Sequence, residues 1–333
     1  MHLCLVTDAW APQVNGVVRT LARMVEEAEA KGHSVTVIHP GLFRTWPCPT
    51  YPEIRLALFA GPGVQRMLDT AQPDAVHIAT EAPLGWAARQ HCLKRGWPFT
   101  TSFHTKFPEY VKARTGIPTG LGYALLRHFH NKAAAVMVNT PTMHRDLTAR
   151  GIRNLVMWSR GVDTALFRPG DKSAFDHLTR PVFLYVGRLA VEKNVRAFLD
   201  LDLPGSKAVV GDGPMLETLR QCYPEVAFVG AKHGPDLAHH YAGADVFVFP
   251  SLTDTYGLVM LEALASGLPV AAYPVPGPND VIDGHDIGVL DDDLGRAARA
   301  AVEIPSERCR NFALDFSWTQ SADQFLDNLA QIR

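Results

Sequence analysis

The sequence lacks the features that would place it in a membrane or in a disulfide framework. No hydrophobic run approaches the roughly 20 residues needed to cross a bilayer. The start, MHLCLVTD, enters a predicted strand without the basic segment and cleavage site of a signal peptide. The five cysteines are scattered without C-x-x-C spacing, so neither a zinc site nor a disulfide framework is expected. We therefore expect a cytosolic protein.

Several ligand-binding patterns are also missing. The first turn, DAWAPQVNG, lacks the G-x-G-x-x-G of a dinucleotide-dependent oxidoreductase. Basic residues are dispersed and do not alternate with aromatic ones, so no nucleic-acid partner is expected. No cluster of metal ligands stands out in the sequence, and we expect neither a metal nor a cofactor.

The net charge of −2 hides an asymmetry between the two halves of the chain. Residues 1–170 hold 19 Lys and Arg against 11 Asp and Glu, a charge of +8, whereas residues 171–333 hold 13 against 23, a charge of −10. A basic half beside an acidic half indicates that the first half meets an anionic partner, such as a membrane surface or a phosphorylated substrate.

Short apolar runs alternate with helical segments along the whole chain of 333 residues. This pattern predicts parallel sheets covered by helices on both faces, and two successive series predict two doubly wound, Rossmann-like α/β domains. The predicted parts are a first domain over 1–168, a second over 169–316, and a C-terminal helix over 317–333 that packs back on the first domain. The first boundary falls in RGVDTALFRPGDKS, where Pro169 and Gly170 end a polar loop.

The stretch SLTDTYGLVMLEALASGLPV, residues 251–270, follows a predicted buried strand at 246–249. It predicts a loop carrying Asp254 and a helix from Gly257 to Ser266 carrying Glu262. Two acids would then flank a helix N-terminus at the carboxyl edge of a sheet, where α/β folds bind anionic ligands. The alternative is that Asp254 only caps the helix and Glu262 faces solvent.

Two cations follow the first strand of the second series, in YVGRLAVEKNV. Arg188 and Lys193 would lie at the same sheet edge and could bind a diphosphate; the alternative is a pair of solvated charges, one beside Glu192. Turn glycines occur at 16, 211, 213 and 230. They allow either close approach of a nucleotide or tight packing of turns.

Taken in order, the segments NGVVRTL, SFHTKFPEY, RGVD, GRLAVEK, GDGP, DVFVFPS, TDTYGLVMLEALASGLPV and FSW span almost the whole chain. In this order they resemble the retaining GT-B glycosyltransferases of family 4, which transfer sugars from nucleotide diphosphate sugars. The likeness is greatest to the glycolipid-forming subgroup with mannosyl-, glucosyl- and sulfoquinovosyl-diacylglycerol synthases. The resemblance implies two Rossmann-like domains that face a central cleft.

The resemblance also implies roles for single residues. Arg188 and Lys193 would bind the donor diphosphate, Glu262 the ribose hydroxyls, and His104, in SFHT, would lie near the reacting sugar. Asp254 stands where the family usually has Glu, so the shorter carboxylate puts the identity of the sugar in question. The catalytic set is therefore His104, Arg188, Lys193 and Asp254, and the further donor-binding positions are Gly16, Gly187, Gly230, Tyr256, Gly257, Leu258, Val259 and Glu262.

By the same resemblance the enzyme is a hexosyltransferase that retains anomeric configuration without a metal, and it moves a hexose or hexuronic acid to an acceptor hydroxyl. The acceptor should lie against the basic first domain, in a segment, 106–132, that mixes basic and apolar residues. Such a segment can lie in an anionic interface or be an ordinary helix. Its candidate contacts are Lys112, Arg114, Arg127 and Lys132.

We therefore expect a membrane lipid such as diacylglycerol as acceptor and a peripheral position on the cytoplasmic face of the membrane. A UDP-sugar is favoured over GDP-mannose as donor, with base recognition near residues 230–233. Two alternatives stay open. One is a transferase for a soluble saccharide or small metabolite, and the other is a catalytically silent nucleotide-sugar-binding protein, which only the change to Asp254 supports.

Overall fold

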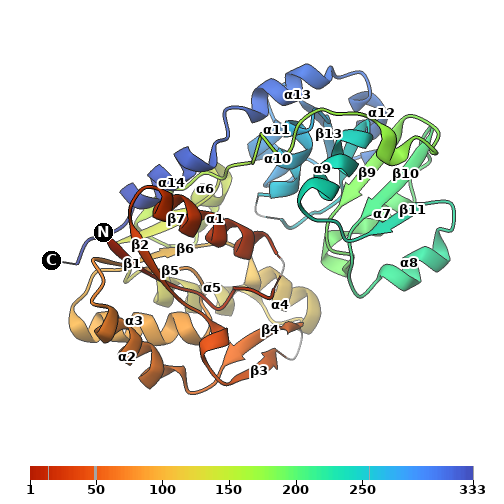
Figure 1. Ribbon diagram of the computed structural model, residues 1–333. Coiled ribbons are helices and arrows are strands. Elements are labelled where there is room, and N and C mark those ends of the chain that lie inside the picture. Colours follow the sequence, from red (N-terminus) through yellow and green to blue (C-terminus); the bar gives the residue numbers. More distant parts are fainter. Residues whose placement is uncertain (14, 49–50, 255, 333) are drawn as a thin grey trace. The chain divides into compact units, whose positions relative to one another are not determined.

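The computed structural model describes residues 1–13, 15–48, 51–254 and 256–332, and it does not describe the side chains at 51–53, 110 and 113–115. The chain forms two compact units. Unit 1 comprises Met1–Arg160 with Trp318–Arg333, and unit 2 comprises Gly161–Ser317. Figure 1 shows a sheet flanked by helices in each unit. Both units have the predicted α/β class.

Unit 1 contains a parallel six-stranded sheet in the order β2-β1-β5-β6-β7-β8. Its strands are β1 (His2–Val6), β2 (Ser34–Ile38), β5 (Ala75–Ile78), β6 (Thr100–Ser102), β7 (Ala135–Val138) and β8 (Leu155–Met157). Its helices are α1 (Gly16–Ala30), α2 (Ala60–Ala71), α3 (Pro83–Arg95), α4 (Phe107–Thr115), α5 (Thr119–His130), α6 (Pro141–Ala149) and α14 (Trp318–Asp327).

The alternation along β1 explains why this sheet needs helices on both faces. Cys4 and Val6 pack in one apolar cluster with residues of α2, α3, α5 and α6, whereas Leu3 and Leu5 pack in another with residues of α1 and α14. Successive strand residues point to opposite faces. Because all four side chains are apolar and buried, neither face can be left to solvent.

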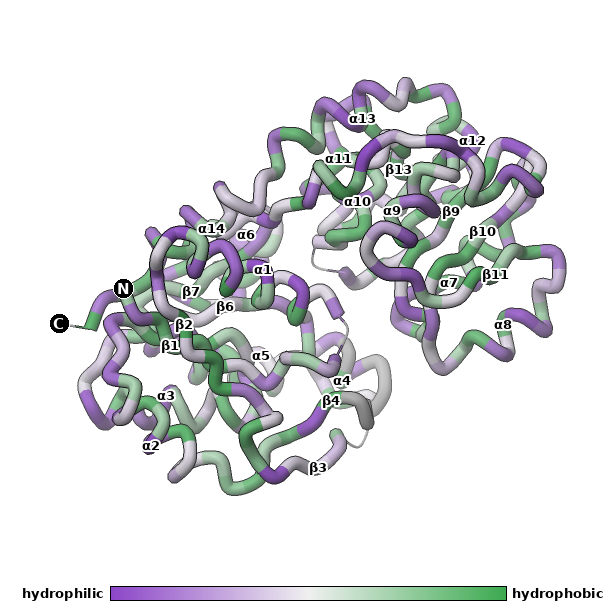
Figure 2. Tube along the Cα trace, viewed as in Figure 1, coloured by the Kyte–Doolittle hydropathy of each residue, from purple (hydrophilic) through white to green (hydrophobic). Residues whose placement is uncertain are grey.

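Unit 2 contains a second parallel six-stranded sheet, in the order β11-β10-β9-β12-β13-β14. Figure 2 shows hydrophobic residues along β9 and β10, as expected of strands covered on both faces. The strands are β9 (Val182–Val186), β10 (Ser206–Val210), β11 (Ala227–Gly230), β12 (Val246–Phe249), β13 (Val270–Ala272) and β14 (Gly288–Leu290). The helices are α7 (Val195–Leu199), α8 (Leu216–Cys222), α9 (Gly234–Gly243), α10 (Leu258–Ala265), α11 (Pro278–Ile282), α12 (Leu294–Ala301) and α13 (Ser306–Ala313).

The first crossing between the units lies earlier than the sequence predicts. The predicted boundary follows residue 168, but residues 161–168 belong to unit 2. Val162 and Phe167 are buried in the core of unit 2, and Arg310 donates hydrogen bonds to the carbonyls of Thr164 and Phe167 at 2.9 and 2.7 Å. These apolar and polar contacts hold the segment that the sequence pattern alone presents as a loop.

The C-terminal helix α14 lies in unit 1. Phe325 and Ala322 join the apolar cluster that contains Leu21 and Met24 of α1. An ion pair of 2.7 Å between Lys31 and Asp323 adds to this contact.

Unit 1 also holds a small antiparallel sheet that the sequence pattern did not predict. It consists of β3 (Thr45–Cys48) and β4 (Tyr51–Ala57) and follows the short helix η1 (Pro40–Leu42). In Figure 1 it is the orange hairpin, separate from the six-stranded sheet. The sequence pattern did not predict these strands because of the prolines at 47, 49 and 52. Proline cannot donate a hydrogen bond to a strand ladder and usually argues against a strand.

Candidate functional site

The sheet of unit 2 has the strand order of a classic dinucleotide-type Rossmann fold. In chain order its strands run 3-2-1-4-5-6, so the direction of winding reverses between β9 and β12. These two strands pair in parallel, with Leu184 opposite Phe247. In open α/β sheets the loops after such a pair diverge and leave a crevice for a ligand. The predicted donor residues lie on these two loops.

An ion pair joins the loop after β9 to the loop after β12. Lys193, in the short helix η3 (Val191–Lys193), lies with its Nζ 2.5 Å from Oδ1 of Asp254, and the two side chains are 27% and 15% exposed. The next residue, Asn194, donates from Nδ2 to the carbonyl of Pro250 at 3.1 Å. The two loops at the reversal point are therefore held together by side chains that sequence reasoning had assigned to separate tasks.

Arg188 follows β9 and is exposed, and a buried tyrosine positions its backbone. The hydroxyl of Tyr185 donates to the carbonyl of Arg188 at 2.9 Å. Burial raises the pKa of Tyr185 well above its ordinary value, and the negative charges of Asp254 and Glu192 raise it further. The phenol therefore stays protonated and able to donate. Sequence reasoning missed Tyr185 because an apolar strand context predicts only a core side chain.

Glu262 does not face solvent, which contradicts one of the two interpretations that the sequence left open. It lies on α10, is 3% exposed, and its Oε2 accepts a hydrogen bond from the hydroxyl of Tyr241 at 3.0 Å. Tyr241 comes from α9 and is fully buried against Phe167. A buried carboxylate needs hydrogen-bond donors, and Tyr241 supplies one. Nothing in the sequence pattern pointed to Tyr241 as a partner.

Helix α10 begins after Gly257, whose φ of 80° lies in the left-handed region. A Cβ at this glycine would come within 3.0 Å of the ring of Phe249 and of the methyl of Met260. The buried Tyr256 precedes it, and Leu258 and Val259 form the first turn of the helix. The helix therefore starts directly beyond the loop that carries Asp254, as the sequence predicts.

The glycines of GDGP are explained by packing between neighbouring loops. A Cβ at Gly211 would lie 1.9 Å from the carbonyl oxygen of Gly187, and one at Gly213 would lie 2.5 Å from that of Leu189. The loops after β9 and β10 therefore touch through backbone atoms. Gly230 ends β11, which is two strands away from β9 in the sheet.

In unit 1 the strand order reverses between β1 and β5, and a buried acid lies there that sequence reasoning missed. Asp8, 3% exposed, accepts hydrogen bonds from the backbone N–H groups of Leu84 and Gly85 at 3.1 and 3.4 Å and bonds the hydroxyl of Thr80 at 3.0 Å. It therefore caps helix α3 from another element. Burial raises the pKa of Asp8 to about 6, against the opposing effect of these donors.

His104 follows β6 and lies in a row of polar side chains. Its Nδ1 is 3.3 Å from Nη2 of Arg160, and its Nε2 is 2.8 Å from Oγ of Ser102. The Ser102 hydroxyl is in turn 3.1 Å from Nε2 of His77, whose Nδ1 is 2.9 Å from Oγ1 of Thr100. Burial lowers the pKa of His104 well below its ordinary value, and the charge of Arg160 lowers it further.

The direction of this row follows from chemistry. A guanidinium can only donate, so Nδ1 of His104 accepts, and the neutral imidazole must carry its proton on Nε2. That proton is donated to Ser102, which leaves the serine proton for His77. Arg160, in the RGVD segment, thus selects the tautomer of His104, a role that sequence reasoning missed although the motif was noted.

The other predicted residues of unit 1 lie on different elements. Gly16 begins α1, whose first turn is capped by Asn15, with Oδ1 3.0 Å from the N–H groups of Val17 and Val18. Lys112 and Lys132 are exposed, whereas Arg127 donates to the carbonyl of Arg150 at 3.2 Å. The predicted contact Arg114 lies outside the described side chains.

Among the residues that the structure describes, no three His, Cys, Asp or Glu side chains are grouped so that they could hold a metal ion. Within the same residues, every helix is too short or too polar to cross a membrane.

The chain matches two family models, one for each half. Residues 14–166 match the model described as Glycosyltransferase Family 4, and residues 180–305 match that of Glycosyl transferases group 1. A GDP-mannose-dependent alpha-mannosyltransferase of Mycobacterium tuberculosis is 30% identical over all of this chain and 97% of its own length. The alpha-monoglucosyldiacylglycerol synthase of Streptococcus pneumoniae is 28% identical over 87% of this chain and 75% of its own.

Solved structures share the fold at lower identity. Sucrose-phosphate synthase from Thermosynechococcus elongatus has a TM-score of 0.79 and 21% identity, covering 98% of this chain and 97% of its own. The Anabaena protein HepE in complex with UDP and glucose has a TM-score of 0.73 and 15% identity, covering 98% of both chains. Together with the two Rossmann-like units, these neighbours confirm the predicted GT-B fold class.

Proposed function

Because this chain belongs to glycosyltransferase family 4, we propose that it transfers a hexose or hexuronic acid from a nucleotide diphosphate sugar to a hydroxyl of a membrane lipid such as diacylglycerol. The observation that carries the proposal is the Lys193–Asp254 pair at the strand reversal of unit 2, together with the buried Glu262 on the following helix α10. This arrangement provides a cation for a diphosphate and two carboxylates for hydroxyl groups at the place where Rossmann sheets bind nucleotides.

In this proposal each group of unit 2 binds one part of the donor. Arg188 and Lys193 bind the diphosphate, together with the first turn of α10 at Gly257–Val259. Glu262, oriented by Tyr241, accepts hydrogen bonds from the ribose hydroxyls. Asp254 accepts from the sugar hydroxyls. Its ion pair with Lys193 supports this assignment, because the sugar and the diphosphate are directly linked in the donor.

The proposed reaction retains the anomeric configuration and needs no metal. The bond between the anomeric carbon and the diphosphate oxygen breaks, the acceptor oxygen bonds to the same face, and the acceptor proton passes to the diphosphate. Arg188 and Lys193 stabilise the charge that develops on the leaving group. His104 contributes as a neutral group, because burial and Arg160 keep its pKa low. Gly16 would allow backbone to approach the donor phosphates.

The lipid acceptor is supported by the relatives and by the surface of unit 1. Similar proteins include the Streptococcus pneumoniae synthase and the sulfoquinovosyl transferase of Arabidopsis thaliana, 31% identical over 72% of this chain and 50% of its own. On α5, Leu121 and Leu125 are 70% and 56% exposed and lie one turn apart. Exposed Lys112 and Lys132 are on the same stretch of chain. Basic and apolar side chains of this kind suit the surface of an anionic bilayer, so we place the enzyme peripherally on its cytoplasmic face.

The first test uses purified protein with UDP-glucose, UDP-glucuronate or GDP-mannose and detergent-dispersed diacylglycerol, with nucleotide and lipid products read by mass spectrometry. The sequence favours UDP, whereas relatives at 30–31% identity are named for GDP-mannose, and the donor panel separates the two. Glycolipid made by the wild type and not by Glu262→Gln supports the proposal. The matched control, Glu303→Gln, changes an exposed acid and should be fully active.

Two other results would contradict parts of the proposal. Nucleotide release without a lipid product would move the acceptor to a soluble molecule. If no donor is turned over, the result would indicate a protein that binds nucleotide sugars without catalysis. Activity that persists in a chelator, and a product whose anomeric configuration equals that of the donor by NMR, are the results expected for a metal-independent retaining enzyme. The double variant Leu121→Ser/Leu125→Ser should weaken binding to phosphatidylglycerol vesicles, and Leu314→Ser, another exposed leucine, should not.

A further inference from the structure

The β3–β4 hairpin of unit 1 has one face toward the core and one toward solvent. Thr45 pairs with Ala57 and Trp46 with Leu56. Ala57 is buried at 5% exposure, whereas Trp46 is 63% exposed. Because neighbouring strand residues point to opposite faces, Trp46 and Leu56 lie on the outward face. By the same alternation Leu58, whose N–H donates to the carbonyl of Arg44 at 2.8 Å, continues that face.

The outward face is apolar, contrary to the usual pattern. In antiparallel sheets with one buried face, the residues on the other face are normally polar. Here Trp46 and Leu58 are exposed at 63% and 42%, and the following Phe59 at 95%. Leu42, 48% exposed, ends η1, which contacts β4. These four residues are the hairpin patch. Single exposed apolar residues are common, but a group of large ones marks an interaction surface.

Phe59 is the member of the patch that folding explains least. It precedes helix α2 with φ of 52°, in the left-handed region that suits glycine and is unfavourable for a bulky residue. Its side chain, 95% exposed, adds almost nothing to the core and makes no capping hydrogen bond. An aromatic ring held in this conformation and pointed at solvent is explained if the ring binds something outside the chain.

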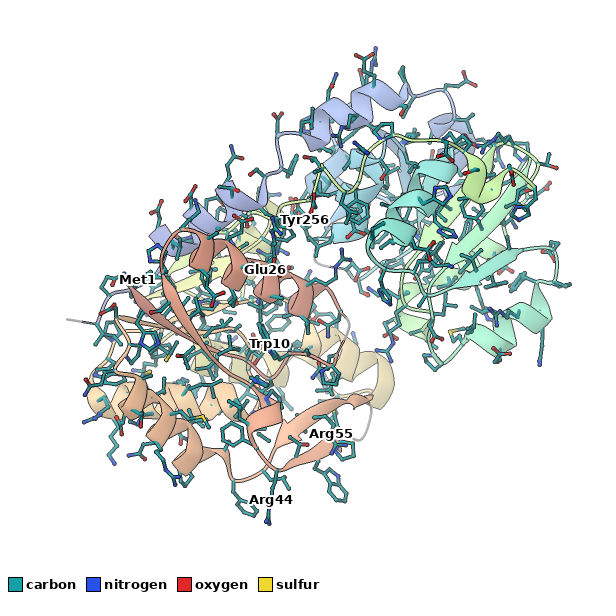
Figure 3. The ribbon with its side chains drawn as sticks, viewed as in Figure 1. Met1, Trp10, Glu26, Arg44, Arg55 and Tyr256 are labelled. Carbon is teal, nitrogen blue, oxygen red and sulfur yellow. The ribbon has the colours of Figure 1, made fainter. Side chains whose placement is uncertain are left out.

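The charges near the patch favour binding to an anionic surface. Arg44 and Arg55 are exposed on the hairpin, and Figure 3 labels both. Arg55 donates a hydrogen bond of 3.1 Å to the Thr45 hydroxyl, on the face opposite Trp46. Arg44, two residues before Trp46, lies on the same face as the patch. The third charged residue between 42 and 59 is Glu53, whose side chain is not described. Unit 1 as a whole holds 19 Lys and Arg against 12 Asp and Glu, a net charge of +7.

We propose that the hairpin patch, Leu42, Trp46, Leu58 and Phe59, is a lipid-binding surface that enters the headgroup region of an anionic bilayer, with Arg44 on the phosphates. Tryptophan and phenylalanine beside arginine is the combination that stabilises a protein at this depth. The inference rests on the proposed lipid acceptor and adds a second membrane contact, separate in sequence from α5.

Sedimentation with phosphatidylcholine vesicles, with and without phosphatidylglycerol, measures this contact in the full-length protein. Trp46→Ser/Phe59→Ser should lower the fraction bound to the anionic vesicles at least fivefold. Arg44→Gln should also lower it and should make the remaining binding less sensitive to salt, because one electrostatic contact is lost. The controls Leu314→Ser and Arg145→Gln change exposed residues elsewhere and should bind as the wild type does. Equal binding by Trp46→Ser/Phe59→Ser and wild type, or no vesicle binding by either, would overturn the proposal.

Two further measurements guard against misfolded variants. Phe59→Gly relieves the left-handed backbone, so its melting temperature should equal or exceed that of the wild type while its vesicle binding falls. Brominated lipids should quench tryptophan emission in the wild type, and Trp46→Phe should lose most of this quenching while it still sediments with vesicles. Unchanged quenching in Trp46→Phe would show that Trp46 does not enter the lipid and would overturn the proposed insertion.

The detergent assay separates this inference from the proposed function. Detergent-dispersed diacylglycerol needs no bilayer, so the patch variants should keep wild-type turnover there. If glycolipid forms in detergent and the patch variants bind vesicles as the wild type does, the proposed lipid contact of the hairpin is wrong but the proposed acceptor stands. If no glycolipid forms in detergent but vesicle binding still depends on Trp46 and Phe59, the proposed lipid acceptor is wrong but the proposed lipid contact of the hairpin stands. A vesicle-independent interaction through the patch, seen as self-association lost in Trp46→Ser/Phe59→Ser, would assign the surface to a protein instead.

Discussion

Lys193 and Asp254 stand 61 positions apart in sequence and form an ion pair of 2.5 Å across the point where the sheet of unit 2 reverses its winding. The pair unites a residue expected to bind phosphate with one expected to bind sugar. Each charge stabilises the other. The pair therefore helps to hold the two loops together.

Removing the positive charge of Lys193 should lower the rate of transfer more than the stability of the fold. Lys193→Gln leaves Asp254 partly exposed and unpaired, so the fold persists, but the charge that develops on the leaving diphosphate loses a partner. We expect kcat/KM to fall about 100-fold, on the order of 2.7 kcal/mol, as when a transition-state donor is lost. Steady-state kinetics measure it. Lys31→Gln, which breaks the ion pair with Asp323, is the matched control and should keep wild-type kinetics.

Lengthening the acid should alter sugar preference. Asp254→Glu adds one methylene to a carboxylate that already contacts Lys193, so its oxygens must move with respect to the donor sugar. We expect the ratio of kcat/KM between two donors with the same nucleotide to change at least tenfold, about 1.4 kcal/mol. The affinity for the nucleotide alone, measured by calorimetry, should stay constant. Parallel changes for all donors and for the nucleotide would show that Asp254 does not contact the sugar.

The hydroxyl of Tyr241 should matter for donor binding. Tyr241→Phe keeps the ring that packs on Phe167 but removes the donor to Glu262. The loss of a hydrogen bond to a buried charged group costs about 1.5–3 kcal/mol. We expect KM for the donor to rise at least tenfold with little change in kcat. Tyr223→Phe removes the hydroxyl of a surface tyrosine bonded to Asp200 and should leave KM unchanged. Equal KM values for both variants would contradict the proposed role.

Asp8 should make unit 1 less stable as the pH rises. Its folded pKa of about 6 exceeds the ordinary value of 3.8, so the folded protein binds the proton more tightly than the unfolded chain. The favourable contribution is complete below about pH 4 and is lost as the pH rises through 6; two pKa units correspond to about 3 kcal/mol. Melting temperatures of wild type and Asp8→Asn, measured from pH 4 to 7, should diverge in this direction. A constant difference would contradict it.

His77 should act in the opposite direction. Burial lowers its pKa from 6.5 to about 3, helped by the charge of Arg160. A histidine with a depressed folded pKa contributes stability that is complete above pH 6.5 and is lost as the pH falls toward 3. Acid should therefore destabilise the wild type more steeply than His77→Gln, which cannot be protonated. Melting curves from pH 7 to 4 test this. His33→Gln serves as control, because His33 is a partly exposed histidine that does not belong to the row of hydrogen bonds containing His77.

The alternation of apolar runs and helices was enough to predict both parallel sheets, because strands buried on both faces are mostly apolar. The loops that carry Arg188, Lys193 and Asp254 could be placed at one sheet edge for the same reason: parallel strands all end there. Their roles came from resemblance, since spacing alone left solvated charges as an alternative. The β3–β4 hairpin was missed because its prolines are atypical of strands.

The sequence by itself thus determined the two Rossmann-like units, the edge at which polar loops gather and the family. Only the tertiary structure decided that Lys193 pairs with Asp254, that Tyr241 supports Glu262, that Asp8 caps a distant helix and that Arg160 selects the tautomer of His104. These contacts join residues from separate elements, and the strand order and helix packing that bring them together leave no local periodic signal. Apolar periodicity reports which face of an element is buried, whereas hydrogen-bond partners depend on where that face is placed.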